Sequence, residues 1–503
     1  MWKHRDAAAR GAAEYKGMVE AFKEGSLTPE QFAKGRGLYG VYAQRVPGTY
    51  MVRVRIPGGI LDLDGLELVL GAARARGLLK VHATTRQDIQ FHGLVLEETV
   101  RLVEDLARSG LSVKGSGGNG ARNVALPPEA GFLEGEVFDV APHGLAVERH
   151  LQEEPLAFSL PRKFKIALSP LDADPAGARI ADLGLIARIR DGERGFCAYA
   201  GGGLGRNPKE SLLLVDFLPE RRLLALVRGT LEFFAREGDW KDRSKARLRH
   251  IRDRMGDKAF GEGILAAYAA TGDIPLVLEE EGIPKGRRRK GSVSLRPPGG
   301  EYHLGELEQV RRHLQELPGP VCLRLTNNQG LWVGNLGVRE ARRFAAAFAS
   351  LRPRFPLEGS LGCVGASICS IGIGKPQETL EAVVRRFLLE PPAIRRALPA
   401  LQMSGCPSSC ARHQVASIGC MGRIKKIDGS PVPAYTLFLG GSMDGAGVRM
   451  GDAYGEIRAV DLPDFLVALA RLKVEAGAGE VDFDRFLEEQ GEAVREMADR
   501  WKV

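Results

Sequence analysis

The sequence contains no stretch that approaches the ~18 consecutive apolar residues of a membrane-spanning helix, so we expect no membrane span. Its first residues also lack the apolar core of a secretory signal. Cysteine is scarce, because seven residues in a chain of 503 are too few for a scaffold held by disulfides. These absences predict a cytoplasmic globular protein, and its length suits about three domains.

The composition has an excess of basic residues, with 71 Lys and Arg against 63 Asp and Glu and a net charge of +8. Such a charge favours an acidic partner, which could be nucleic acid, an anionic cofactor or substrate, or an acidic carrier protein. The basic residues are not interleaved with aromatic ones, and no nucleic-acid-binding motif is present. We therefore expect no nucleic-acid partner.

A long segment of the sequence occurs twice. Residues 52–94 recur 241 residues later, from Pro57 to Pro298 for example, and the alignment contains no gap. The chain is therefore predicted to be a duplication, and Gly201-Gly202 with Gly440-Gly441 give a weaker second echo of it. The matched residues are Pro57-Gly58-Gly59 with Pro298-Gly299-Gly300, Thr85-Arg86-Gln87 with Thr326-Asn327-Asn328, and Gly93 with Gly334.

Two further segments have a predicted place. The basic segment 284–300 is rich in Pro and Gly and is predicted to be an exposed linker into the second copy. Residues 462–503 have helical periodicity with mixed charges, and we expect a surface helical tail there.

Four of the seven cysteines form two pairs, Cys363 with Cys369 and Cys406 with Cys410. In a reducing compartment such pairs indicate metal ligands rather than disulfides. The C-x5-C spacing is wide for structural zinc, and the compact cysteine run of bacterial ferredoxins is absent. Two loose pairs suit an Fe–S cubane, with zinc or unrelated core cysteines as the alternatives.

Basic residues at the edges of predicted strands form a second group. Arg53 alternates with apolar residues in MVRVRI, and the second copy replaces it by Ser294, so this arginine is not required for packing. Several desolvated cations in one place need a strongly anionic partner. The other candidates are Arg86, Arg122, Lys163 and Lys165.

The ordered motifs MVRVRIPGG, TTRQDIQFHG, ARNV, LPRKFK, C-x5-C and GCPSSC, together with the duplication, closely resemble the sulfite and nitrite reductases that carry sirohaem coupled to a 4Fe-4S cluster. The resemblance runs from about residue 37 to about residue 441. It implies an α/β (α+β) fold of three domains with an internal pseudo-twofold duplication. The predicted parts are an N-terminal segment (1–45), a ferredoxin-like domain of both copies (46–110 with 290–350), a first sirohaem-contacting α/β domain (111–283), and a 4Fe-4S and sirohaem α/β domain (351–503) that ends in the helical tail.

The resemblance also assigns roles to individual residues. It implies that the four paired cysteines bind the cluster and that Cys410 also bridges to the sirohaem iron. The substrate-side cations that match the family are Arg53, Arg122, Lys163 and Lys165. The residues expected to contact the cofactor are Thr85, Arg86, Gln87, Asn327, Asn328 and Cys410.

The activity that this implies is the six-electron reduction of sulfite to sulfide. The RKFK form, with Lys165, resembles the sulfite-reducing branch, and nitrite reduction to ammonia is the alternative. An oxygenase of the precorrin-3B synthase type and a nucleic-acid-binding protein with a structural metal are more distant alternatives. The chain has no flavin or nicotinamide fingerprint, so the expected electron donor is an acidic ferredoxin-like protein.

Overall fold

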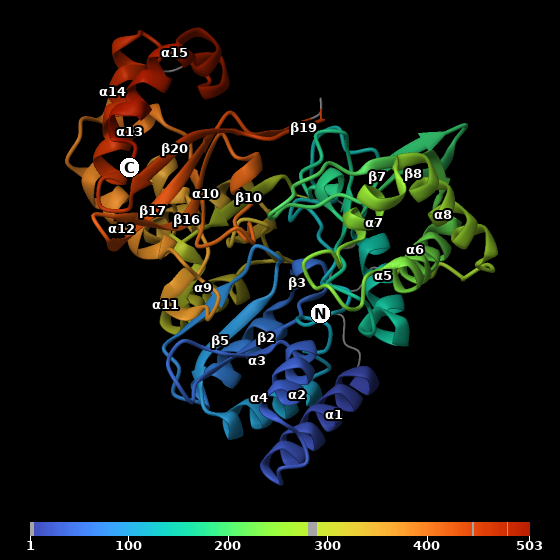
Figure 1. Cartoon of the computed structure of the whole chain (residues 1–503). Coiled ribbons are helices and arrows are strands. Elements are labelled where there is room, and N and C mark those ends of the chain that lie inside the picture. Colours follow the sequence, from blue (N-terminus) through green and yellow to red (C-terminus); the bar gives the residue numbers. More distant parts are fainter. Residues whose placement is uncertain (1–4, 280–288, 445–446, 480) are drawn as a thin grey trace. The chain divides into compact units, whose positions relative to one another are not determined.

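The computed structural model describes residues 5–279, 289–444, 447–479 and 481–503 (Figure 1). Two compact units make up the described chain. The first lies within residues 1–203, 209–294 and 302–347, and the second lies within residues 204–208, 295–301 and 348–503. No helix in the described ranges has both the length and the apolar character needed to cross a bilayer. Both units mix helices with sheets, which confirms the predicted α/β (α+β) class.

Apart from residues 295–301, both repeat copies lie in the first unit, and they build two sheets that exchange one strand each. β3 (Ile60–Leu61) belongs to the first copy but pairs with β12 (Cys322–Leu325) of the second. In return, β11 (Glu301–His303) of the second copy extends the sheet of the first. This reciprocal exchange is what a twofold relation between the copies requires, and it supports the predicted duplication. The strand orders are β1-β2-β5-β4-β11 and β10-β13-β12-β3, with β1 (Val41–Ala43), β2 (Tyr50–Val54), β4 (Lys80–Ala83), β5 (Ile89–Leu94), β10 (Gly291–Leu295) and β13 (Leu331–Leu336).

The alignment of the two copies without a gap is wrong after the first helix. α3 (Leu63–Arg74) and α9 (Leu304–Gln315) begin 241 residues apart, but the strands β4 and β12 begin 242 apart because the connection after α9 is one residue longer. The backbone agrees, since Gln87 and Gln329 both have a positive φ, of 60° and 65°. The structural equivalents of Thr85, Arg86 and Gln87 are therefore Asn327, Asn328 and Gln329.

Each unit also contains a sheet that begins with parallel pairing, one pair in the first unit and two pairs in the second, and continues antiparallel. In the first unit the order is β6-β7-β8-β9, and in the second it is β14-β15-β16-β17-β20. The glycine turns correspond as expected, because Gly201 N donates to Asp182 O and Gly440 N donates to Ser417 O, both at 3.0 Å. The strands are β6 (Ile166–Ser169), β7 (Leu183–Arg190), β8 (Glu193–Ala200), β9 (Leu212–Pro219), β14 (Leu361–Gly362), β15 (Leu401–Ser404), β16 (Ile418–Ile427), β17 (Ser430–Leu439) and β20 (Asp452–Arg458), and β18 (Ser442–Asp444) pairs separately with β19 (Gly447–Arg449).

The remaining helices cover these sheets and help to close apolar cores in both units. The first unit holds α1 (Arg5–Lys23), α2 (Pro29–Arg36), α4 (Leu96–Arg108), α5 (Ala141–Glu153), α6 (Leu223–Glu237), α7 (Leu248–Met255), α8 (Asp257–Ala270) and α10 (Val338–Ala347). The second unit holds α11 (Gly365–Ile368), α12 (Pro376–Leu388), α13 (Pro392–Ala397), α14 (Leu462–Glu475) and α15 (Phe483–Trp501).

The C-terminal helices are not a surface tail. Leu462, Phe465, Leu466 and Leu469 of α14 are fully buried in the core of the second unit, so this helix is structural. Of the predicted linker, residues 284–288 lie outside the described residues, and β10 begins at Gly291.

Candidate functional site

The two cysteine pairs lie at the same edge of the sheet in the second unit. β14 and β15 are parallel neighbours, with Gly362 opposite Met403. Cys363 directly follows β14, and Cys406 follows β15 by two residues. Because the carboxyl ends of parallel strands meet at one edge, this topology brings the pairs together. Gly405 N donates a hydrogen bond to Cys363 Sγ at 3.1 Å and ties the two loops to each other.

The thiols of the two pairs lie within electrostatic reach of one another. Burial raises the pKa of Cys363 to about 12, and the neighbouring Cys410 and Cys406 act in the same direction. The pKa of Cys369 is also raised, mainly by burial and then by Cys410 and Cys406. Thiols with a raised pKa keep their protons until a metal replaces them. The structure thus brings the four predicted ligands together, while their role as ligands stays a prediction.

Within the described ranges, no group of three or more His, Cys, Asp or Glu side chains is arranged to hold a metal ion. A structural zinc ion needs its four ligands gathered closely around a single centre. A cubane is wider, since each of its irons takes one thiolate at a separate corner. A cluster held by the four cysteines therefore stays the prediction, with zinc as its alternative.

The loop that carries Cys406 and Cys410 has a counterpart without cysteines in the first unit. Ala411 N donates to Ser404 Oγ at 3.1 Å, as Ala176 N donates to Ser169 Oγ at 3.2 Å. Asp174 and Ser409 occupy equivalent places in these loops and have positive φ values of 51° and 54°. The backbone and the serine at the strand end therefore set the conformation of the loop.

His413 follows the second cysteine pair and is fully buried. Burial lowers the pKa of this histidine to about 4, so its ring is neutral at ordinary pH. Its ring lies 5.3 Å from that of Phe438, and neither ring nitrogen has a hydrogen-bond partner among the described residues. These contacts indicate a packing role for this histidine.

The predicted cations all lie in the first unit, in two groups that Arg86 connects. Lys163 and Lys165 precede β6, and Arg86 Nη2 donates to Ile166 O at 2.7 Å, directly beside Lys165. Burial lowers the pKa of Lys165 well below its ordinary value, and Lys163, Arg86 and Arg247 lower it further while Asp182 opposes them. Among the described residues no carboxylate oxygen lies within ion-pair distance of the Lys165 side chain.

Arg53 and Arg122 form the other group and hold the same loop. Arg53 Nη1 donates to Ser116 O at 3.0 Å. The Arg122 guanidinium is buried and donates to the carbonyl oxygens of residues 115, 117, 118 and 120, at 3.3, 2.5, 2.6 and 3.1 Å. Burial lowers the pKa of Arg122 to about 10, and the nearby Arg53 and Arg55 contribute. Both arginines therefore fix the loop 115–120, and their contact with substrate stays a prediction.

The residues predicted to contact the cofactor differ in their burial and in the hydrogen bonds that they already make within the protein. Gln87 is fully buried, and its Nε2 donates to Leu325 O at 2.8 Å while its Oε1 accepts from Leu126 N at 3.1 Å. Gln87 therefore joins backbone segments of both repeat copies. Asn327 donates to Leu126 O at 3.2 Å, and its Oδ1 is buried with no hydrogen-bond partner in the described chain. Thr85 and Arg86 are half-buried and Asn328 is exposed.

Two basic residues that the sequence analysis missed lie beside Lys165. Arg247 forms a two-pronged ion pair with the buried Asp182, at 3.0 and 2.8 Å from its Nη2. Arg249 is only 4% exposed, and its Nε and Nη1 have no hydrogen-bond partner among the described residues. Burial lowers the pKa of Arg249 to about 10, with Arg247 second. The dense basic run RSKARLRH was the available signal, but it is equally typical of a solvated helix end.

This part of the first unit fits a ligand that carries carboxylates. A buried guanidinium with unpaired N–H groups is costly, and a carboxylate would supply the missing acceptors. Gly203 borders the same place, where a Cβ would lie 2.9 Å from Arg249 Nη1 and 3.1 Å from Arg247 Nη2. The missing side chain leaves room for the two guanidinium groups at this place. The polycarboxylate macrocycle of sirohaem therefore suits Arg249, with Arg247 and Lys165 adjacent.

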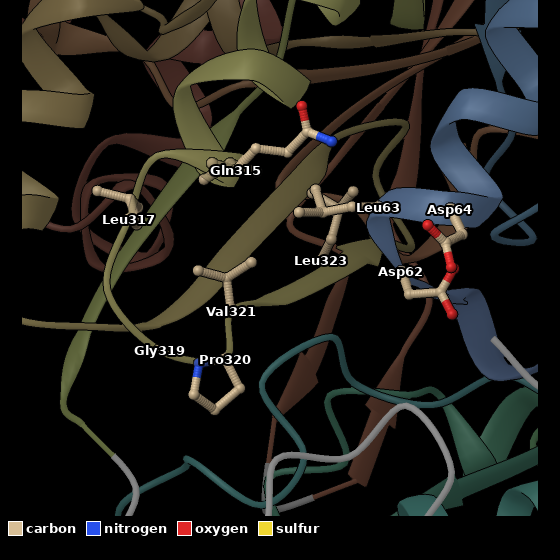
Figure 2. Close-up of a pocket in the computed structure, with 10 residues that line it drawn as sticks. Asp62, Leu63, Asp64, Gln315, Leu317, Gly319, Pro320, Val321 and Leu323 are labelled. Carbon is tan, nitrogen blue, oxygen red and sulfur yellow. The ribbon is translucent and has the colours of Figure 1, made fainter.

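A separate cavity of about 380 Å³ lies in the first unit between the start of α3 and the connection from α9 to β12 (Figure 2). Figure 2 shows Asp62 and Asp64 on one side of it and Val321 and Leu323 among its apolar lining. None of the predicted site residues lines this cavity, so it is not the candidate site.

Comparison with known proteins identifies the family. Residues 42–109 match the family model of the nitrite/sulfite reductase ferredoxin-like half domain, and residues 117–269 match that of the nitrite and sulphite reductase 4Fe-4S domain. The ferredoxin–nitrite reductase of Synechococcus elongatus is 29% identical over 445 residues, which cover 84% of this chain and 85% of that protein. The chain belongs to the nitrite and sulfite reductase family. This reductase is an oxidoreductase, and its family carries sirohaem and a 4Fe-4S cluster.

Two further similar proteins agree with this family assignment. The sulfite reductase [NADPH] hemoprotein beta-component of Acidithiobacillus ferrooxidans is 29% identical over 474 residues, covering 84% of this chain and 81% of that protein. The structure of the Mycobacterium tuberculosis NirA protein has the same fold, with a TM-score of 0.78, 22% identity, and coverage of 92% of this chain and 91% of that one. The segment that matches the 4Fe-4S domain model, residues 117–269, contains a single cysteine, Cys197. The paired cysteines lie instead in the second unit, whose sheet resembles that of the first.

Replacement of a predicted cluster ligand should remove the cluster. We expect Cys369→Ser to lose most of its bound iron and acid-labile sulfide, because each corner of a cubane needs a thiolate. Cys197→Ser is the matched control, since Cys197 is buried in the first unit and donates to Asp216 O. The iron and acid-labile sulfide content per chain should be measured for both variants. A Cys369→Ser protein with a full complement of both would contradict the assignment.

Replacement of Arg249 should have opposite effects on cofactor content and on stability. Arg249→Met removes a buried charge with unpaired donors, so the free energy of unfolding of the cofactor-free protein should rise by about 1–3 kcal/mol. The same change removes a carboxylate partner and should lower the sirohaem content of purified protein. Arg254→Met, at a side chain that is 53% exposed, should change neither. Unchanged sirohaem content in Arg249→Met would contradict the proposed contact.

Proposed function

We propose that this reductase converts nitrite to ammonia by a six-electron reduction, with electrons from an acidic ferredoxin-like protein. The observation that carries the proposal is the similarity to the ferredoxin–nitrite reductase of Synechococcus elongatus, which extends over most of both chains. The relatives favour nitrite over sulfite, which is the reverse of the sequence expectation. Sulfite reduction on the same site is the second candidate, since a sulfite reductase is also among the relatives.

The behaviour of Lys165 weakens the earlier argument for sulfite. A further cation suits sulfite, the more highly charged anion, only where its positive charge is fixed. Burial and three neighbouring cations lower the pKa of Lys165 well below its ordinary value, so its charge is not fixed in the protein alone. A lysine of this kind donates a hydrogen bond or a proton more readily than it holds a permanent charge.

The chain's own residues supply charge, orientation and protons. When bound, sirohaem supplies an iron site for the substrate, and the cluster supplies an electron path to it. Arg53 and Arg122 place fixed positive charge that favours entry of an anion. Lys163 and Lys165 carry the donors suited to protonate the oxygens that leave as water. These roles match the family positions, and each awaits a direct test.

Substrate preference can be measured directly. With reduced methyl viologen as donor, we expect kcat/KM for nitrite to exceed that for sulfite by roughly tenfold or more, equivalent to about 1.4 kcal/mol. Lys165→Asn should lower turnover of both substrates, because it removes a proton donor, and Lys80→Asn, at an exposed strand start, should lower neither. A higher kcat/KM for sulfite would contradict the nitrite proposal and favour the second candidate.

The dependence of turnover on salt concentration tests the proposed acidic electron donor. The chain has a net charge of +8, so docking of an acidic carrier should be electrostatic. Turnover supported by reduced ferredoxin should fall several-fold as ionic strength rises to about 0.5 M, because the Debye length shrinks. Turnover with methyl viologen is the control and should change much less. A ferredoxin rate that is independent of salt would refute electrostatic docking.

A further inference from the structure

Asp88 is a buried carboxyl that its own loop does not require. It ends the loop 84–88, in which Asp88 N donates to Thr84 Oγ1 at 3.0 Å and Asp88 O accepts from Thr84 N at 2.9 Å. The second repeat closes the same loop with a glycine, since Gly330 N donates to Thr326 Oγ1 at 2.7 Å and Gly330 O accepts from Thr326 N at 2.9 Å. The carboxyl therefore has a role other than closing the loop.

The two carboxyl oxygens of Asp88 have different surroundings. Oδ1 accepts a hydrogen bond from Asn123 Nδ2 at 3.0 Å. Oδ2 is buried and has no hydrogen-bond partner among the described residues. A carboxylate left with an unpaired buried oxygen is costly, whereas the neutral acid is tolerated much better. The position therefore suits a group that takes up a proton.

The charged groups that face Asp88 come from every element packed against it. They are Arg53 of β2, Arg55 directly after β2, Arg86 of its own loop, Arg122, and Glu148 of α5. Arg55 is already paired with Glu148 at 2.8 Å, and both side chains are buried. The groups left to balance Asp88 are therefore Arg53, Arg86 and Arg122, two of which are predicted substrate cations. Burial raises the pKa of Asp88 to about 6, although the arginines pull it down.

We propose that Asp88 is a positioning residue that changes the net charge of the Arg53, Arg86 and Arg122 group by one unit when it binds a proton, and so sets the affinity of the site for its anionic substrate. It acts through the arginines, and the proton comes from solvent. The ionised carboxylate cancels one positive charge and weakens anion binding. The protonated carboxyl leaves the full charge and strengthens it. The proposal rests on the proposed function only in requiring an anionic substrate, whether nitrite or sulfite.

The pH dependence of nitrite affinity tests this inference in the holoenzyme. Nitrite keeps one negative charge over the range from about pH 5 to about pH 8, so the anion itself does not titrate there. In the wild type we expect the KM for nitrite to rise by roughly tenfold across this range, while kcat changes much less. Asp88→Asn cannot ionise, so its KM should stay low and lose this rise. Equilibrium binding of nitrite to the oxidised enzyme without a donor should show the same difference.

Two further variants keep the test decisive. Asp88→Gly places there the residue that the second repeat uses, and it serves if Asp88→Asn does not fold. Glu129→Gln is the matched control, because burial raises the pKa of Glu129 too but this residue faces Arg324. The control should keep the wild-type rise. Retention of that rise in Asp88→Asn or Asp88→Gly, or its loss in Glu129→Gln, would overturn the inference. Failure of the nitrite proposal would appear separately, as a preference for sulfite with the pH effect of Asp88 intact.

Discussion

One buried ion pair holds the segment on which the cation group depends. Arg55 and Glu148 are almost completely buried, and Arg55 Nε lies 2.8 Å from Glu148 Oε2. The remaining donors of Arg55 bind the carbonyl oxygens of Ala121 and Arg122, at 2.8 and 3.0 Å, and Glu148 Oε1 accepts from Val124 N. Both side chains of this pair therefore also hold the backbone of residues 121–124. A buried pair with one partner removed leaves an uncompensated charge, which typically costs about 3–5 kcal/mol.

The duplication explains how one scaffold carries two kinds of chemistry. Both units have a sheet with the same strand pattern, and both repeat copies contribute a loop closed by a threonine. The packing residues are shared, while the charged and sulfur-bearing ones are not. The first copy has Asp88 where the second has Gly330, and the first unit has Asp182 where the second has Ser417. The charged and sulfur-bearing side chains predicted to form the site are thus ones that the common fold does not need.

Sequence patterns predicted what depends on local spacing. The cysteine pairs, the glycine turns and the alternation around Arg53 could all be read because neighbours along the chain determine them. The patterns failed where distant packing decides. Arg249 is in a run of charges typical of an exposed helix end, yet other segments bury it. Likewise, α14 has mixed charges but fills the core, and the extra residue after α9 leaves no signature apart from the altered register.

The matching loops after β6 and β15 bear on how the holoprotein is assembled. In the first unit, Leu171 and Pro175 occupy the places that Cys406 and Cys410 take in the second, and that loop is held by protein groups that include Ser169, Asp174 and Arg179. The conformational entropy of this loop is therefore lost when the polypeptide folds, not when metal binds. Zinc fingers fold only around their ion, whereas here a folded chain presents its second thiol pair on a loop that is already shaped. Cluster insertion can then follow folding as a separate step.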